Sequence, residues 1–432
     1  MNEHGFSHLN LRAQVIRTLL AVQQGQSLAS ILPQHLEKVS ERDRGLFHEL
    51  VLGSLRQWYA LKSIALPLLS KPLNNETVET CLYVGLYQLL CTRIAAHAAI
   101  SETVDAVKQL GFSALSGVVN AILRRISREI ETFQTQLNQA HGLPSWLYKR
   151  LKKDWNEQIE SLIPALKQTA PLTLRVNTRK ISREAYFNKL CSAGIQARLG
   201  SLSDVAIIVE QSVHIPALPN YADGFFSVQD EHAQLCGQIL TQLDDQIVVD
   251  ACAAPGGKTA HLLEKFKPKQ LIALDHDAKR LVRVSENLSR LQLNHAQIQI
   301  LAADATTWTA PEAVDCILLD SPCSAIGVMR RHPDIRLLRQ PSDISQTVAL
   351  QKEILNQMWK QLKVGGRLLY ITCSILKAEN EHQMQDFFAT HADATEIKID
   401  ANWGIAQIHG RQLLPENGFG DGFYYCYIEK TS

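Results

Sequence analysis

The stretch that decides the fold is VVDACAAPGGKT, residues 248–259. Its apolar, β-branched start is typical of a buried strand, and the helical pattern that begins at Lys258 follows two glycines. Glycine and other small residues let the backbone approach a ligand closely at the turn between a strand and a helix. We therefore predict a ligand-binding turn that opens an α/β domain.

Strand and helix patterns alternate on both sides of this turn. Predicted strands cover 247–251, 271–274, 298–301, 315–319 and 367–371. Predicted helices cover 258–266, 277–291 and 345–362. Repeated βα units with right-handed crossovers form a parallel sheet with helices on both faces. Residues 231–432 are therefore predicted to form a doubly wound, Rossmann-like α/β domain.

Two other regions precede this domain, so the chain is predicted to be multidomain. In residues 1–142 apolar residues recur at helical spacing and strand patterns are rare, which predicts an all-α domain of five to seven helices. Residues 143–230 contain a predicted strand at 172–176, a helix at 183–193 and a strand at 205–209. This order is typical of a small α+β domain of the ferredoxin-like or RRM-like type.

Composition narrows the class of protein. The 432 residues are 46% hydrophobic and 20% charged, which is enough apolar material for several buried cores. Nine scattered cysteines, an odd number, indicate a reducing compartment, so we expect a cytoplasmic protein. We expect no metal site, because no cysteine or histidine spacing suggests zinc, and no secretory signal, because the chain starts with polar residues. The longest apolar stretch, 81–100, contains Arg93 and His97, which predicts a buried helix rather than a membrane span.

Positive charge is clustered, although the formal net charge is only +1. Residues 1–150 contain 15 Lys and Arg against 11 Asp and Glu, which leaves +4. Dense basic clusters occur at 124–128, 149–153 and 330–336. Such clusters favour a polyanion as partner, although any one of them is more often a solvated face. We therefore expect contact with nucleic acid.

The glycine turn distinguishes between classes of nucleotide cofactor. A phosphate-binding P-loop needs glycine at the position of Cys252, and the dinucleotide pattern of three spaced glycines is also absent. S-adenosylmethionine remains, since it carries no phosphate. Asp275, after the second predicted strand, is placed to accept the ribose hydroxyls, and Asp304, after the third, to accept from the adenine amine. Either carboxylate alone is as often a helix cap.

Cys323 and Cys373 each follow a predicted strand closely. Ligands of such sheets lie beyond the carboxyl ends of the strands, so both thiols are predicted to face one crevice. A thiolate that adds to C6 of cytosine makes C5 nucleophilic toward a methyl donor, and it can leave again. Asp320, at a strand end, is placed to hold the N3/N4 edge of the base. Taken alone, either cysteine is more often a small buried hydrophobe.

Together these motifs resemble the bacterial 16S ribosomal RNA cytosine-C5 methyltransferases of the RsmB/NOP family, in the RsmB (Fmu/Sun) type that carries a NusB-like domain at its N-terminus. The resemblance spans nearly the whole chain. It rests on Asp250–Thr259, Asp275, Asp304, Asp320-Ser321-Pro322-Cys323-Ser324, Gly327, Arg330–Asp334, Thr372-Cys373-Ser374 and Gly420–Tyr424.

The resemblance implies methylation of C5 of one cytosine in 16S ribosomal RNA, cytosine 967 in the family, before the small subunit is assembled. It implies that Cys373 is the nucleophile and that Cys323 assists release. It implies S-adenosyl-L-methionine as methyl donor, S-adenosyl-L-homocysteine as product, and a NusB-like domain that positions RNA. The residues that it assigns to the cofactor site are Cys252, Ala253, Ala254, Pro255, Gly256, Gly257, Lys258, Asp275, Asp304 and Asp320. We expect a monomer.

Two other functions compete with this interpretation. A DNA cytosine methyltransferase uses a Pro-Cys cysteine as the attacking group, which would make Cys323 the nucleophile. The helical first domain and the Thr372-Cys373-Ser374 motif argue against that class. A non-catalytic RNA-binding factor of the NusB type would need neither thiol nor cofactor carboxylates, and both are present.

Overall fold

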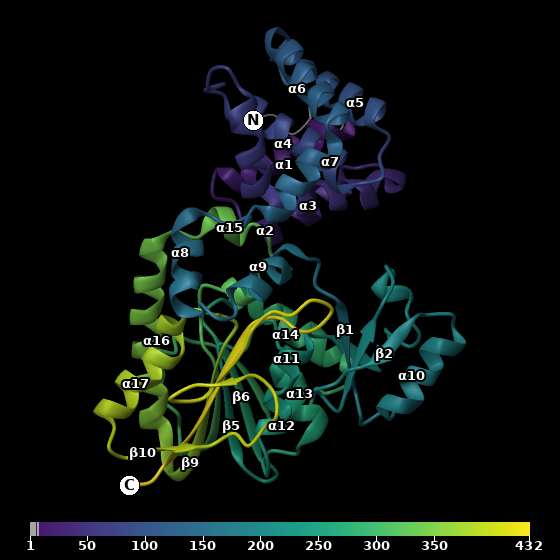
Figure 1. Ribbon diagram of the computed structural model, residues 1–432. Helices are drawn as coiled ribbons and strands as arrows, with labels where there is room; N and C mark the ends of the chain where they lie inside the picture. The colour runs from purple at the N-terminus through teal and green to yellow at the C-terminus, as the bar shows by residue number, and fades with distance from the viewer. Residues whose placement is uncertain (1–5, 7) are drawn as a thin grey trace. The chain divides into compact units, whose positions relative to one another are not determined.

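The computed structural model describes residue 6 and residues 8–432, and Figure 1 shows their course. The chain divides into two compact units. The first contains the described residues up to Gln168 together with Met329–Gln340, and the second contains Thr169–Val328 and Pro341–Ser432. No helix in the described part of the chain is long and apolar enough to cross a lipid bilayer. The domain boundaries expected after residues 142 and 230 stay a prediction.

The first unit is built from helices, as the sequence predicted. Up to residue 142 its described part contains seven α-helices: α1 (Leu11–Gln23), α2 (Leu28–Glu37), α3 (Arg44–Ala65), α4 (Glu76–Cys91), α5 (Ala96–Gln109), α6 (Ser116–Arg128) and α7 (Ile130–Gln139). Further along the chain are α8 (Ser145–Asp154), α9 (Ile159–Lys167) and α15 (Ile335–Leu338). The 3₁₀ turns are η2 (Glu41–Asp43), η3 (Leu66–Leu68) and η4 (Ser113–Leu115). Asn10 and Asn75 cap α1 and α4, since each side chain accepts a hydrogen bond from a backbone N–H three residues later.

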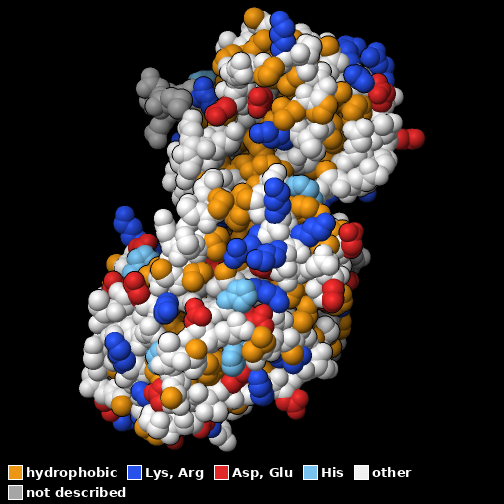
Figure 2. Space-filling model, turned by 60° about the vertical axis from the view of Figure 1, so that its left-hand side comes forward, with side chains coloured by type: hydrophobic (Ala, Val, Ile, Leu, Met, Phe, Trp, Pro, Cys, Tyr) orange, Lys and Arg blue, Asp and Glu red, His pale blue; other side chains and the backbone are white. Residues whose placement is uncertain are grey.

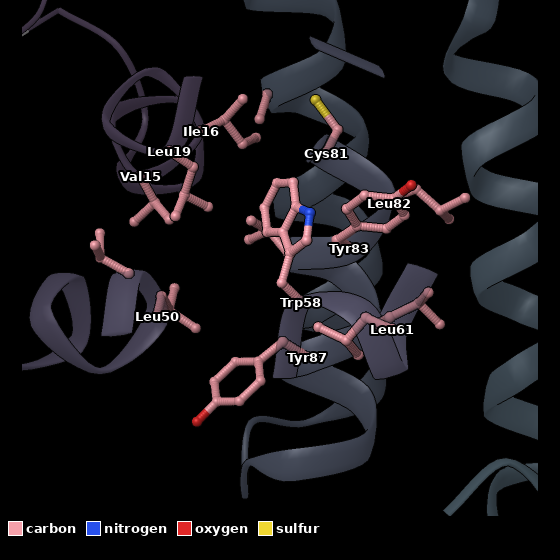
Figure 3. Packing of buried hydrophobic residues seen from close by; sticks show 14 of the residues in the cluster. Val15, Ile16, Leu19, Leu50, Trp58, Leu61, Cys81, Leu82, Tyr83 and Tyr87 are labelled. Atoms are coloured by element: carbon pink, nitrogen blue, oxygen red, sulfur yellow. The ribbon is translucent and has the colours of Figure 1, made fainter. Parts of the chain in front are cut away.

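Helix α4 lies at the centre of the core of this unit. Nearly every residue from Val78 to Leu90 is buried. The ring of Trp58 on α3 meets the ring of Tyr83 on α4 edge-on, with centroids 5.0 Å apart and planes inclined by 82° (Figure 3). Burial on all sides explains why the segment from Val78 to Leu90 is apolar nearly throughout. The buried helix predicted over 81–100 is confirmed as far as Cys91, where α4 ends, but the stretch is not one helix, because residues 96–100 belong to α5.

The basic cluster at 330–336 also belongs to the first unit, and part of it is not a surface patch. Arg330 and Arg336 are fully buried. The Arg336 guanidinium donates to the carbonyl oxygen of Leu166, and the Arg56 guanidinium donates to the carbonyl oxygen of Arg330. Burial and then the charge of Arg56 lower the pKa of Arg336 to about 9. The prediction of a polyanion-binding surface was wrong for these two arginines, because they lie in the interior.

The other two basic clusters are exposed. Blue Lys and Arg side chains form several groups on the face that Figure 2 shows. The exposed members of the two clusters are Arg124, Arg125 and Arg128 on α6, and Lys149, Lys152 and Lys153 on α8. These residues remain available to a polyanion.

The second unit contains two sheets, and the smaller one is antiparallel in the order β2-β3-β1-β4. Its strands are β1 (Leu172–Val176), β2 (Ala197–Leu199), β3 (Ala206–Val209) and β4 (Phe226–Val228), and its helix is α10 (Arg183–Ser192). The predicted strands at 172–176 and 205–209 and the predicted helix are confirmed. β2 and β4 were not predicted, because three residues are too few to show an alternating pattern. The fully buried Arg175 of this sheet forms a bidentate ion pair with Glu264, with both N–O distances 2.8 Å.

The larger sheet has nine strands in the order β11-β12-β13-β9-β8-β5-β6-β7, and β10 pairs with β13. Its parallel strands are β5 (Ile247–Ala251), β6 (Gln270–Asp275), β7 (Ile298–Ala302), β8 (Val314–Asp320) and β9 (Leu362–Thr372). Its antiparallel strands are β10 (Ala394–Ile397), β11 (Ile405–Ala406), β12 (Arg411–Leu413) and β13 (Phe423–Lys430). The helices and 3₁₀ turns of this part are η5 (Ile215–Ala217), α11 (Glu231–Gln234), α12 (Cys236–Ile239), α13 (Gly257–Lys265), α14 (Ala278–Leu291), η6 (Ile326–Val328), α16 (Pro341–Gln361), η7 (Lys377–Glu379) and α17 (Glu381–Thr390).

Helices cover both faces of the parallel strands. α13 and α14 form one core with strand residues such as Val248, and α16 and α17 form another with strand residues such as Val249. Successive strand residues therefore point to opposite faces and must both be apolar. All five predicted strands and the doubly wound arrangement are confirmed. The sheet as a whole is mixed rather than parallel, because β13 pairs antiparallel with β9.

Candidate active site

The two cysteines leave the sheet side by side because their strands are parallel neighbours. Asp320 at the end of β8 pairs with Ile371 near the end of β9, and Ser321 N donates to Ile371 O at 2.9 Å. The turns that follow these strands bring the Sγ atoms of Cys323 and Cys373 to 3.3 Å. The prediction that both thiols face one place at the strand ends agrees with this geometry, and both side chains are partly exposed.

Glycine allows the two cysteine turns to approach a third segment. Gly327 N donates to Cys373 O at 3.0 Å, and Gly422 N donates to Gly327 O at 2.9 Å. A Cβ atom on Gly327 would lie 2.3 Å from the Gly422 oxygen and 2.7 Å from the Cys373 oxygen. Only glycine fits this position, since both oxygens belong to the backbone.

The loop after β5 has the tight backbone that its composition predicted. Cys252 and Gly256 adopt left-handed φ angles of 62° and 92°, and α13 begins at Gly257. The loop is fixed to the neighbouring strand, since Ala253 N donates to Leu274 O at 2.9 Å and Ala254 N donates to Asp275 Oδ2 at 3.2 Å. Pro255 is exposed at the tip of the loop.

The two carboxylates assigned to the cofactor have different surroundings. Asp275 is buried beside the glycine loop, and its Oδ1 also accepts from Asp277 N at 3.1 Å. Asp304 is exposed, and its Oδ1 accepts from the backbone N–H and the hydroxyl of Thr306 at 2.8 and 2.7 Å. These hydrogen bonds lower the pKa of Asp304. Asp304 therefore caps a turn, and its contact with a cofactor stays a prediction.

Lys258 connects the glycine loop to the cysteine turns. Its Nζ lies 2.5 Å from Asp320 Oδ2 and 5.6 Å from the centre of the Phe423 ring. Burial lowers the pKa of Lys258, but the Asp320 carboxylate and the nearby thiols outweigh it, so the pKa is raised and the amine stays charged. An amine already paired in this way is poorly placed to neutralise a phosphate. The site therefore fits an adenosyl sulfonium cofactor, which has no phosphate, better than a nucleotide.

The contact between the thiols makes them chemically unequal. The hydrogen bond with Cys373 comes first, followed by burial and by the charges of Cys373 and Glu379, and together they raise the pKa of Cys323 well above its usual value. Cys323 is thereby favoured as the protonated partner of the pair. A protonated Cys323 can donate to the Cys373 sulfur, which is the arrangement needed for one nucleophile and one proton donor.

Sequence reasoning missed the polar residues beneath the cysteine turns. Glu379, Asn380 and Gln412 are buried, and each accepts from or donates to residues of these turns. Glu379 follows Cys373 by six residues in a 3₁₀ turn, where no periodicity marks it. The available signal was the polar run at 379–383, which follows β9 only after the apolar pair Ile375-Leu376.

The chain matches three family models. A model described as 16S rRNA methyltransferase RsmB/F matches residues 237–429. A model of the ferredoxin-like domain of RsmF/B-like methyltransferases matches residues 143–216, and the NusB family model matches residues 9–128. In chain order, the NusB match falls on helices of the first unit, the ferredoxin-like match includes most of the smaller sheet, and the methyltransferase match falls on the larger sheet.

Individual relatives match over nearly their whole length. A Pseudomonas putida protein named ribosomal RNA small subunit methyltransferase B is 45% identical, over 98% of this chain and 99% of its own. A Vibrio cholerae protein of the same name is 41% identical over 98% of both chains. The crystal structure of PH0851 matches with a TM-score of 0.79 at 22% identity, over 97% of this chain and 99% of its own. A methyltransferase homologue from Pyrococcus horikoshii matches with a TM-score of 0.59 at 25% identity, over 67% of this chain and 96% of its own.

A titration experiment tests the burial of Asp250 below the glycine loop. Asp250 is fully buried, Thr259 Oγ1 donates to its Oδ2 at 2.5 Å, and burial raises its pKa to about 7. Between about pH 4 and pH 7 the folded chain then keeps a proton that the unfolded chain has released, so this group makes the free energy of unfolding fall as pH rises. Asp250→Asn keeps an acceptor for Thr259 and cannot titrate.

We expect urea unfolding to show that Asp250→Asn gains stability relative to the unsubstituted chain across this window. The gain should reach on the order of 4 kcal/mol at pH 7 and stay constant above it. If the difference in the free energy of unfolding between the two proteins does not change with pH, the pKa of Asp250 is not raised by burial.

Proposed function

Because these matches show that the chain belongs to the RsmB/F family of 16S rRNA methyltransferases, we propose that it methylates C5 of one cytosine in 16S ribosomal RNA through a covalent adduct. The chain is an S-adenosylmethionine-dependent rRNA methyltransferase. The position on the base, the covalent route and the target, cytosine 967, form the proposal. The observation that carries it is the 3.3 Å contact between Cys323 Sγ and Cys373 Sγ beside the glycine loop.

The proposed reaction begins at Cys373. Its thiolate adds to C6, and the displaced electron pair makes C5 nucleophilic. S-adenosylmethionine supplies the methyl group to C5 and leaves as S-adenosylhomocysteine. Cys323 then gives its proton to the Cys373 sulfur as the C6–S bond breaks, and the Cys323 thiolate that results takes the proton from C5. The electron pair of the C5–H bond restores the aromatic ring, and the raised pKa of Cys323 suits a group that holds and returns a proton.

Asp320 and Lys258 are proposed to orient the base. The Asp320 carboxylate can accept from the N4 amine and stabilise a proton on N3 during the addition. Lys258 holds this carboxylate at 2.5 Å and fixes it beside the glycine loop. Positioning of this kind favours one face of the ring for the thiol and leaves the C5 edge for the methyl donor.

The RNA is proposed to be 16S rRNA before assembly of the small subunit, bound by a monomer in the cytoplasm. A target base must leave its stack to reach a site at the strand ends, which is least costly in a loop or single strand. The exposed basic clusters on α6 and α8 offer contacts to phosphates.

The roles of the two cysteines are tested by trapping the RNA adduct. Cys373→Ala should form no adduct that survives denaturation, because the attacking sulfur is lost. Cys323→Ala should accumulate one, because release is slowed. The readout is the shift of radiolabelled RNA on a denaturing gel, with Cys191→Ala on the surface of α10 as the control that behaves like the unsubstituted chain. The opposite pattern in the two catalytic variants would overturn the assignment.

The binding of RNA by α6 is tested through its salt dependence. Replacing Arg124, Arg125 and Arg128 by alanine should weaken RNA binding. It should also reduce the slope of log affinity against log salt by about 0.7 for each phosphate that the variant no longer neutralises. The control is the double substitution Lys267→Ala and Lys269→Ala, which removes exposed charge outside both clusters. Equal slopes for all three proteins, measured by filter binding, would remove α6 from the RNA site.

A further inference from the structure

We propose that Glu379 is a positioning residue that holds the two cysteine turns together, so that the sulfur atoms stay in contact through the reaction. This inference rests on the proposed function, in which one thiol attacks and the other assists release. Glu379 ends η7, which lies between β9 and α17, and its side chain is fully buried. From there the carboxylate reaches the turns that follow β8 and β9.

The carboxylate of Glu379 binds both turns at once. Its Oε1 accepts from Ser324 N at 2.6 Å, and its Oε2 accepts from Ser324 Oγ at 2.6 Å and from Ser374 Oγ. Ser324 and Ser374 are the residues directly after Cys323 and Cys373, and their hydroxyl oxygens lie 3.2 Å apart. An ionised carboxylate only accepts hydrogen bonds, so it suits a place where three donors from two turns converge.

Glu379 is itself held firmly. Tyr370 OH donates to the carbonyl oxygen of Glu379 at 2.9 Å. The next residue, Asn380, donates to Ser374 O at 3.0 Å and accepts from Thr372 Oγ1 at 2.5 Å. All these groups are buried, where a hydrogen bond is strong and an unsatisfied partner is costly. Hydrogen bonds from residues at the end of β9 and in the turn after it therefore fix the position of the Glu379 carboxylate.

The charge of Glu379 acts on the two thiols of Cys323 and Cys373. A buried carboxylate disfavours a second negative charge nearby, so it favours a state in which one of the two thiols keeps its proton. Geometry and charge then point to the same role. Glu379 keeps the sulfur atoms close and keeps Cys323 protonated until release.

The first test measures thiol proximity without RNA or cofactor. Hydrogen peroxide oxidises two adjacent thiols to a disulfide and is reduced to two water molecules, and the rate depends on how readily the sulfurs reach about 2 Å. Mass spectrometry should find the Cys323–Cys373 disulfide in the unsubstituted chain. Glu379→Ala should form it at least about tenfold more slowly. Glu379→Asp should be intermediate, since one methylene less prevents it from reaching both turns.

The matched control is Glu381→Gln. Glu381 is buried two residues away, but it accepts from Ile408 N and pairs with Lys377 rather than with the cysteine turns. Its disulfide rate should equal that of the unsubstituted chain.

Glu379→Gln keeps the shape of the side chain and removes its charge. This variant should form the disulfide as fast as the unsubstituted chain, but the pH at which Cys323 begins to react with iodoacetamide should be lower.

The second readout is the kinetics of methyl transfer. Glu379→Ala should lower kcat by about 100-fold with KM for RNA nearly unchanged, as expected when reacting groups shift by about 1 Å. A disulfide rate and a kcat that both equal those of Glu381→Gln would overturn the proposal. If methylation does not occur at cytosine C5 but the disulfide rate falls in Glu379→Ala, the proposed function fails and the positioning role stands.

Discussion

The structure depends on one constraint, the parallel pairing of β8 with β9. This pairing places Asp320 opposite Ile371, so the turns that follow both strands emerge at the same edge of the sheet. Each turn carries one cysteine, and the sulfur atoms meet at 3.3 Å. The glycine loop after β5 opens at the same edge because β5 is the parallel neighbour of β8 on its other side. The order of the strands β5, β8 and β9 thus brings the glycine loop and the two cysteines to one edge of the sheet.

Polar contacts turn this arrangement into a site with defined roles. Lys258 joins the glycine loop to Asp320 on one side, and Glu379 joins the two cysteine turns on the other. Each contact costs desolvation of a charge, which the protein offsets with a partner of opposite charge or with several hydrogen-bond donors. Buried charge of this kind is typical of functional sites.

The sequence predicted the parts of the fold whose pattern is local. β5 was predicted with its observed bounds because a buried parallel strand is apolar on both faces, and the helices between the strands show helical spacing. The placement of Cys323 and Cys373 followed from the rule for strand ends. The choice of Cys373 as nucleophile did not follow from spacing, and it came only from the family resemblance.

The features that sequence reasoning missed are not local. β10 to β13 are short or lack a preceding helix, so no alternation marks their antiparallel pairing. Arg336 looked like surface charge because its partner, the carbonyl of Leu166, is 170 residues away along the chain. Glu379 is a polar residue in a 3₁₀ turn. Its role can be inferred only from the structure, in which Ser324 and Ser374 both donate to its carboxylate.

The most direct test of the central claim is to identify the sulfur that bonds to the base. RNA with 5-fluorocytidine at the target position cannot lose fluorine as a cation, so the adduct persists after methyl transfer. Digestion and mass spectrometry of the trapped complex then locate the bond. We predict a bond from C6 to Cys373 Sγ alone. A bond to Cys323, or methylated RNA with no bond to either sulfur, would contradict it.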